Sequence, residues 1–146
     1  NIIVSRTASK VHGLAGLRVG FAITTPEIAK RMESYLTDSL NIVGLRAAIA
    51  SYQDERFQAF SIEQNNRARK VITDFLDEKE IQYLDSQANF IFIKTGIQIS
   101  DFQPGMEKYG VIVGRPFPPY TDWCRLSMAK PEEMERFNHG FHKVLG

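Results

Sequence analysis

The chain has 146 residues, of which 43% are hydrophobic and 24% charged, and its 18 basic and 17 acidic side chains leave a formal charge of +1. This is the composition of a globular domain with a hydrophobic core, and a charge so close to zero argues against nucleic acid or an anionic membrane as a partner. The single cysteine, Cys124, excludes an intrachain disulfide and, with only three scattered histidines, predicts no metal site.

Two β-branched runs near the start of the chain predict strands at residues 2–4 and 17–23, and the first resembles the middle of a buried strand. Between them lies a polar, glycine-containing turn at residues 6–16. Because the chain opens directly on a strand-like run without an initiator methionine, we expect it to be a piece of a longer protein. No apolar run approaches the roughly 20 residues that span a membrane.

Three helices are predicted next. Thr25-Pro26-Glu27 has the residues of a helix start, and apolar residues at helical spacing continue to about residue 37. A second helix is expected over 42–53, and Asp54 can cap a third of roughly 24 residues, which would span about 36 Å at 1.5 Å per residue. A helix of that length can connect two domains.

Beyond residue 80 the pattern changes to short strands and helices, which predicts a compact α+β arrangement. The expected strands are 81–84, 88–94, 111–113 and 123–128, with helices over 100–109 and from Pro131 onward. We therefore expect one domain over residues 1–75 and a second over 76–146.

The chemistry is concentrated in the polar turn between the first two strands. Hydroxyls at Thr7 and Ser9, the amine of Lys10 and the guanidinium of Arg18 can gather around an anion, because arginine matches phosphate with two hydrogen bonds and lysine acts as a point charge or a nucleophile. From spacing alone, a solvated turn lysine fits as well. A non-catalytic anion-binding domain is one interpretation of this pattern.

The segments Thr-Ala-Ser-Lys (7–10) and Gly-Leu-Ala-Gly-Leu-Arg-Val-Gly-Phe (13–21) resemble the Schiff-base lysine segment of fold-type I pyridoxal-phosphate enzymes, aminotransferase class I/II, and their histidinol-phosphate aminotransferase-like branch. Residues 85–90, 110–117, 123–127 and 131–134 resemble that family's small domain. The resemblance implies an α/β fold, namely the C-terminal portion of the aspartate aminotransferase-like transferase fold. Residues 1–75 would be a remnant of the large-domain sheet with the interdomain helix, and 76–146 the small α+β domain.

The resemblance also implies roles for the residues of the turn. Lys10 is expected to form the Schiff base with pyridoxal 5′-phosphate and then to shuttle the substrate proton. Thr7, Ser9 and Arg18 are expected to form part of the phosphate cup. His12 is expected to pack or to face solvent rather than to act in catalysis, because the lysine already supplies the proton shuttle.

On the substrate side, Arg125 resembles the anchor for a substrate carboxylate or an anionic tail, and Arg115 is a candidate for a second anion contact. If residues 123–128 alternate across a strand, Arg125 points away from the aliphatic set that includes Cys124, which is expected to be a small core residue.

The implied function is that of an aminotransferase, of which this chain is an incomplete, inactive part. It would transfer an amino group between an amino acid or an amino-alcohol phosphate, such as histidinol phosphate, and a 2-oxo acid. The missing N-terminal part of the same protein is expected to supply the cofactor-ring contacts, in a cytoplasmic homodimer. A pyridoxal-phosphate-dependent decarboxylase of the same fold is the alternative enzyme.

Overall fold

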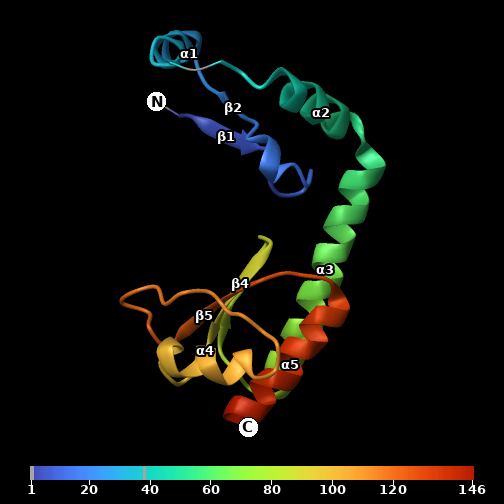
Figure 1. The fold of residues 1–146 in the computed structure, drawn as a ribbon, viewed down its shortest axis with the longest axis vertical. Helices are drawn as coiled ribbons and strands as arrows, with labels where there is room; N and C mark the ends of the chain where they lie inside the picture. Colours follow the sequence, from blue (N-terminus) through green and yellow to red (C-terminus); the bar gives the residue numbers. More distant parts are fainter. Residues whose placement is uncertain (1, 38) are drawn as a thin grey trace. The chain divides into compact units, whose positions relative to one another are not determined.

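The computed structural model describes residues 2–37 and 39–146, which fall into two compact units divided between Ile62 and Glu63 (Figure 1). The division lies within helix α3 (Glu55–Glu78), whose length of 24 residues agrees with the prediction. The domain boundary expected at 75/76 lies in the same helix, but the second unit begins earlier because Ala68, Ile72 and Leu76 belong to its core. The assignment of domains to a larger fold stays a prediction.

The first unit begins with a hairpin of two antiparallel strands, β1 (Val4–Thr7) and β2 (Gly20–Ile23), in which Val4 lies opposite Ile23. Strand β1 shares only Val4 with its predicted range and continues into the predicted turn as far as Thr7. Strand β2 is shorter than predicted, because Leu17 ends the 3-10 turn η1 (Ala15–Leu17) and the strand begins only at Gly20. The expectation that residues 2–4 are buried is wrong, since Ile2 is 75% exposed. In the part of the chain that the structure describes, this sheet has two strands, so nothing covers its flank at Ile2.

Two helices follow the hairpin, α1 (Pro26–Glu33) and α2 (Ile42–Gln53). Helix α1 ends at Glu33, earlier than predicted. Tyr35, expected to lie on its apolar face, is 73% exposed, so its side chain gives the helix no packing contact that would favour a further turn. Helix α2 is capped by Asn41, whose Oδ1 accepts a hydrogen bond of 3.0 Å from Gly44 N. Asp54 caps α3 as predicted, since its Oδ1 accepts from Phe57 N at 2.9 Å.

The second unit is a three-stranded antiparallel sheet of β3 (Tyr83–Leu84), β4 (Phe90–Lys94) and β5 (Trp123–Ser127), in that order. It also contains α3 from Glu63 on, α4 (Ile99–Glu107) and α5 (Pro131–Leu145). One face of the sheet and the buried faces of the helices form a single core. Its members are Ala68, Ile72, Leu76, Ile91, Ile93, Ile99, Phe102, Met106, Val113, Cys124, Leu126, Met134, Phe137 and Phe141. None of the described helices is both long and apolar enough to cross a membrane.

The strand predicted at 111–113 is wrong. This segment has no strand partner among the described residues. The backbone carbonyls at its end bind instead to a side chain of helix α4, because Gln103 Nε2 donates to Val113 O at 3.3 Å and to Gly114 O at 3.1 Å. Val113 is buried and Ile112 is exposed, but the alternation of their burial does not come with strand pairing.

Candidate active site

Lys10 lies in the loop that leaves β1. The loop closes on itself through backbone hydrogen bonds from Ala8 N to Val19 O at 3.0 Å, from Leu14 N to Ala8 O at 2.9 Å and from Gly13 N to Lys10 O at 2.9 Å. Ala8 is fully buried and anchors the loop, whereas Lys10 is exposed. Within the described residues, no hydrogen bond or ion pair involves Lys10 Nζ, so the amine is available to a ligand.

The two hydroxyls predicted at this loop lie side by side. Thr7 Oγ1 donates to Ser9 Oγ at 2.8 Å, and the same Thr7 oxygen accepts from Ser9 N at 3.1 Å. Such bonds are those of a local side-chain turn. They place two hydroxyl groups next to each other immediately before Lys10, in a region open to solvent.

Arg18 has a backbone conformation that is uncommon for its residue type. Its φ of 53° lies in the left-handed region, at the end of η1, and its Nη1 donates to Ala15 O at 2.8 Å. This conformation costs a residue with a Cβ about 1–2 kcal/mol, which glycine would avoid. An exposed arginine at such a position favours a role for the guanidinium itself.

His12 packs, which is one of the two roles expected for it, and it also has a polar partner. It is 5% exposed, its Nδ1 lies 3.1 Å from Ser51 Oγ, and its ring centroid lies 3.9 Å from that of Tyr52. Tyr52 in turn contacts Phe21 of β2, with ring centroids 5.6 Å apart. The lysine loop is thereby attached to the last turn of α2, a contact between distant residues that local sequence patterns cannot indicate.

In the second unit, the alternation predicted for β5 is confirmed. Cys124 and Leu126 are buried against the core, while Arg125 is exposed on the opposite face, directly across from Phe92 of β4. Burial raises the pKa of the Cys124 thiol to about 12, so the thiol stays protonated. Arg125 thus stands on the face of the sheet that is turned away from the core.

Arg125 lines an open hollow of about 500 Å³ with strongly aromatic walls. Its guanidinium carbon lies 5.3 Å from the ring centroid of Phe117 and 5.4 Å from that of Phe90, and that of Arg115 lies 4.4 Å from Phe117. Both arginines therefore contact one ring, and neither forms a salt bridge within the described residues. The lining consists of Leu84, Asp85, Ser86, Phe90, Phe92, Phe117, Pro118, Tyr120 and Arg125.

These aromatic walls were missed by sequence reasoning. Their signal is the spacing of Phe90 and Phe92, which places both on the same face as Arg125, together with the aromatic residues of the segment 115–120.

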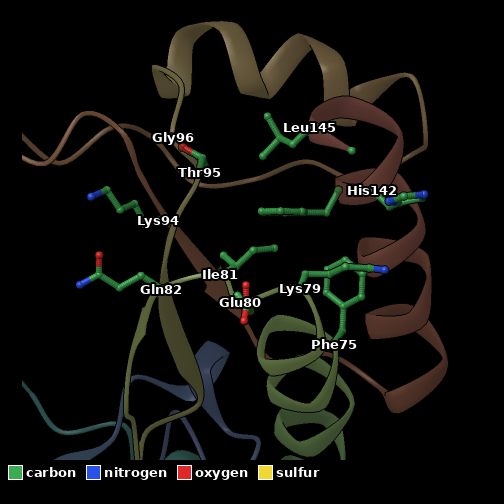
Figure 2. Close-up of a pocket in the computed structure, with 12 residues that line it drawn as sticks. Phe75, Lys79, Glu80, Ile81, Gln82, Lys94, Thr95, Gly96, His142 and Leu145 are labelled. Carbon is green, nitrogen blue, oxygen red and sulfur yellow. The ribbon is translucent and has the colours of Figure 1, made fainter.

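A second cavity, of about 460 Å³, lies in the same unit between the ends of α3, β4 and α5. Figure 2 shows Lys94 and Gln82 extending away from α5, whereas Ile81 and Leu145 face the space between strand and helix. None of the predicted site residues lines it. The predicted residues instead form two groups, one on the Lys10 loop and one around Phe117, each within its own unit.

The sequence profile described as aminotransferase class I and II matches residues 1–140. The chain belongs to this family. It is 34% identical over 149 residues to histidinol-phosphate aminotransferase 2 of Pasteurella multocida (strain Pm70), a match that covers 100% of this chain and 40% of that protein. The chain thus spans about 40% of the length of the curated relatives it matches.

Solved structures show the same fold. A protein from Erwinia carotovora atroseptica SCRI1043, provisionally named histidinol-phosphate aminotransferase, superposes with a TM-score of 0.92 at 36% identity, over 97% of this chain and 41% of that one. The histidinol-phosphate aminotransferase of Sinorhizobium meliloti, solved with pyridoxal 5′-phosphate, gives 0.85 at 24% identity, over 99% and 41%. The predicted family and the predicted fold class, part of a pyridoxal-phosphate-dependent aminotransferase, are confirmed.

Proposed function

We propose that the whole protein is a pyridoxal-phosphate-dependent aminotransferase and that Lys10 is the residue to which the cofactor is covalently attached. The observation that carries this proposal is the Lys10 loop of a class I and II family member, where an exposed, unpaired amine follows two adjacent hydroxyls. A primary amine can attack an aldehyde carbon only when it is neutral and free of a competing partner.

The residues of this loop fit the cofactor. The hydroxyls of Thr7 and Ser9 and the guanidinium of Arg18 are the donors that a phosphate group requires, and the Arg18 backbone conformation argues for selection of its side chain. When bound, pyridoxal phosphate supplies an electron sink for the carbanion at the substrate Cα. Lys10 then has the chemistry to remove and return the proton at that Cα.

Arg125 and Arg115 are the proposed anchors for the substrate's anionic groups, either a carboxylate or the phosphate of an amino-alcohol phosphate such as histidinol phosphate. Support comes from two guanidiniums without carboxylate partners in the described chain, beside a hollow of about 500 Å³. Its aromatic walls suit the ring or aliphatic part of such a substrate. The second substrate is a 2-oxo acid, which receives the amino group.

The remaining parts of the proposal concern the whole protein. We infer that residues 1–75 complete a large domain, that residues 76–146 form a small domain and that the enzyme is a cytoplasmic homodimer. The contacts to the cofactor ring would come from the N-terminal part, because relatives extend well beyond this chain.

Reduction of the full-length protein with borohydride in the presence of pyridoxal phosphate, followed by peptide mapping, tests the central assignment. The reduced cofactor should be found on Lys10, and Lys10→Ala should abolish the shifted absorbance band that the cofactor gains on covalent attachment. Attachment at Lys30 or Lys70 would refute the proposal.

Assays with glutamate and a panel of 2-oxo acids, with carbon dioxide release measured in parallel, separate amino transfer from decarboxylation. A protein that binds phosphate without gaining an absorbance band would instead be the non-catalytic anion-binding domain.

A further inference from the structure

The loop that carries the exposed Lys10 also carries a buried imidazole two residues later. Between them the chain turns tightly, because Gly13 has a φ of 68° and its N–H donates to Lys10 O at 2.9 Å. The turn therefore presents Lys10 on one side and His12 on the other, where the ring is 5% exposed. A polar ring in such a place needs a partner, since a buried unpaired nitrogen is unfavourable.

That partner is on helix α2. His12 Nδ1 and Ser51 Oγ are 3.1 Å apart, and the imidazole lies at 36° to the ring of Tyr52 with centroids 3.9 Å apart. The hydrogen bond restrains the ring within its plane, and the aromatic contact restrains it from one face. Packing alone would be served by an apolar side chain, so the hydrogen bond fixes an orientation that packing does not.

Helix α2 is itself firmly attached to the other end of the same loop. Asn41 Nδ2 donates to Leu17 O at 3.3 Å, and a Cβ at Gly44 would lie only 2.9 Å from Val19 Cγ2. Both ends of α2 thus contact the loop, the first turn near Leu17 and Val19 and the last turn at His12. Helix α2 therefore restrains the segment between β1 and β2 at two points.

We propose that His12 is a positioning residue for Lys10: its hydrogen bond to Ser51 and its contact with Tyr52 hold the turn so that Lys10 Nζ meets the cofactor's aldehyde carbon. This rests on the proposed function, in which Lys10 carries the cofactor. Attack of the neutral amine on the aldehyde carbon, in which a C=N bond would replace the C=O bond and the oxygen would leave as water, is sensitive to approach distance. A misplacement of about 1 Å can reduce such a rate up to a hundredfold. His12 would act through Lys10, because its own ring is buried against Ser51 and Tyr52.

The experiment compares apo full-length variants by stopped-flow absorbance after pyridoxal phosphate is added. His12→Phe keeps an aromatic ring for Tyr52 but loses the hydrogen bond, and Ser51→Ala removes the hydrogen bond from the helix side. Each should slow covalent attachment by about tenfold. The double variant should be no slower than the worse single one, because both remove one interaction.

Two further variants separate positioning from general damage. Ser51→Thr restores the hydroxyl and should attach the cofactor at close to the wild-type rate. His139→Phe is the matched control, since the rings of His139 and Tyr109 are in contact, with centroids 5.8 Å apart, and His139 forms no hydrogen bond within the described residues. This variant should leave the attachment rate unchanged.

Equilibrium binding of pyridoxine 5′-phosphate, which has the phosphate but no aldehyde, should be the same within twofold in all variants. Equal loss of analogue binding and attachment rate would show that His12 merely supports the fold of the loop. A wild-type attachment rate in Ser51→Ala would overturn the hydrogen-bond role. If Lys10→Ala still attached the cofactor, the proposed function itself would fail, a result distinct from either of these.

Discussion

At Arg18, the stability of the fold and the affinity for the cofactor are expected to favour different residues. Its left-handed backbone favours glycine, so Arg18→Gly in the full-length protein should leave the free energy of unfolding unchanged or raise it by up to about 1 kcal/mol. The same change removes the guanidinium proposed to bind phosphate, and cofactor affinity should fall about ten- to a hundredfold. Urea unfolding and fluorescence titration measure the two quantities. Arg18→Gly with full cofactor affinity would show that the side chain only closes its own turn.

The exposed guanidinium of Arg125 should act on substrate binding and not on the cofactor. Arg125→Ala is expected to raise the KM for the amino substrate about ten- to a hundredfold, the value of a charge-assisted hydrogen bond, while the cofactor absorbance stays intact. Lys94→Ala is the matched control, because Lys94 is an exposed cation on the same face of the sheet. Loss of cofactor or of folded protein in Arg125→Ala would indicate a structural ion pair with the rest of the protein.

Cys124 should resist alkylation for as long as the second unit is folded. Cys124 is 1% exposed, so the reagent cannot reach its sulfur. Burial also raises the pKa of the thiol to about 12, so the reactive thiolate does not form at pH 8. Iodoacetamide labelling at pH 8, followed by mass spectrometry, should show no adduct in native protein and full reaction in urea. Rapid labelling of native protein would contradict the placement of Cys124 in the core.

Residue-level features were accessible from the sequence where they depend on local periodicity. The alternation of residues 123–128 correctly separated Arg125 from Cys124, because a strand has a strict period of two. The partner of His12 was inaccessible, since Ser51 lies far along the chain and neither residue changes the pattern of its own segment. The left-handed backbone of Arg18 could not be predicted for another reason. Glycine is the residue that usually indicates this conformation, and arginine does not.

At the scale of elements, the contact between α2 and the lysine loop depends on the absence of a side chain at Gly44. A Cβ there would lie 3.0 Å from Leu17 O and 2.9 Å from Val19 Cγ2, so Gly44→Ala has no room. Overpacking of about 1–3 kcal/mol should outweigh the gain of about 1 kcal/mol in helix propensity.

Urea unfolding of the full-length protein should therefore show lower stability for Gly44→Ala. Gly16→Ala provides the comparison, because a Cβ at Gly16 meets nothing within 4 Å. Its stability should stay within about 0.5 kcal/mol of wild type. Equal behaviour of the two variants would mean that α2 does not hold the loop closely.

Helices were predicted more accurately than strands. The periodicity of α3 and the Asp54 cap sufficed to place a helix of the observed length, because both signals are local. Residues 111–113 have β-branched composition, but a strand also needs a neighbour with free backbone groups. Gln103 supplies side-chain hydrogen bonds there instead, and no pattern in the segment reveals this.

For the whole molecule, the first unit exposes more apolar surface than a self-sufficient domain does. Its large side chains with more than half of their surface exposed include Ile2, Ile3, Ile23, Tyr35, Leu36, Leu40, Ile42, Val43 and Ile49. The described hairpin also has open edges, which invite association.

We therefore expect residues 1–146, expressed alone with pyridoxal phosphate, to show no amino transfer and to scatter light increasingly with concentration. The full-length protein, assayed in parallel with glutamate and a 2-oxo acid, should be active and homodimeric. Turnover by a monomer of the isolated chain, comparable to that of the full-length protein, would refute the fragment interpretation.

The register of strand β5 places Cys124 in the core and Arg125 at the proposed substrate site at the same time. Because Cys124 and Arg125 are neighbours on opposite faces, insertion of one residue between Trp123 and Cys124 would exchange them, placing a guanidinium against Ile91 and Ile93 and a thiol in the hollow. We therefore expect changes of length to be tolerated in the flanking loops, where they do not alter the pleat. Natural variants of this protein should differ in length before Trp123 or after Ser127, but never between them.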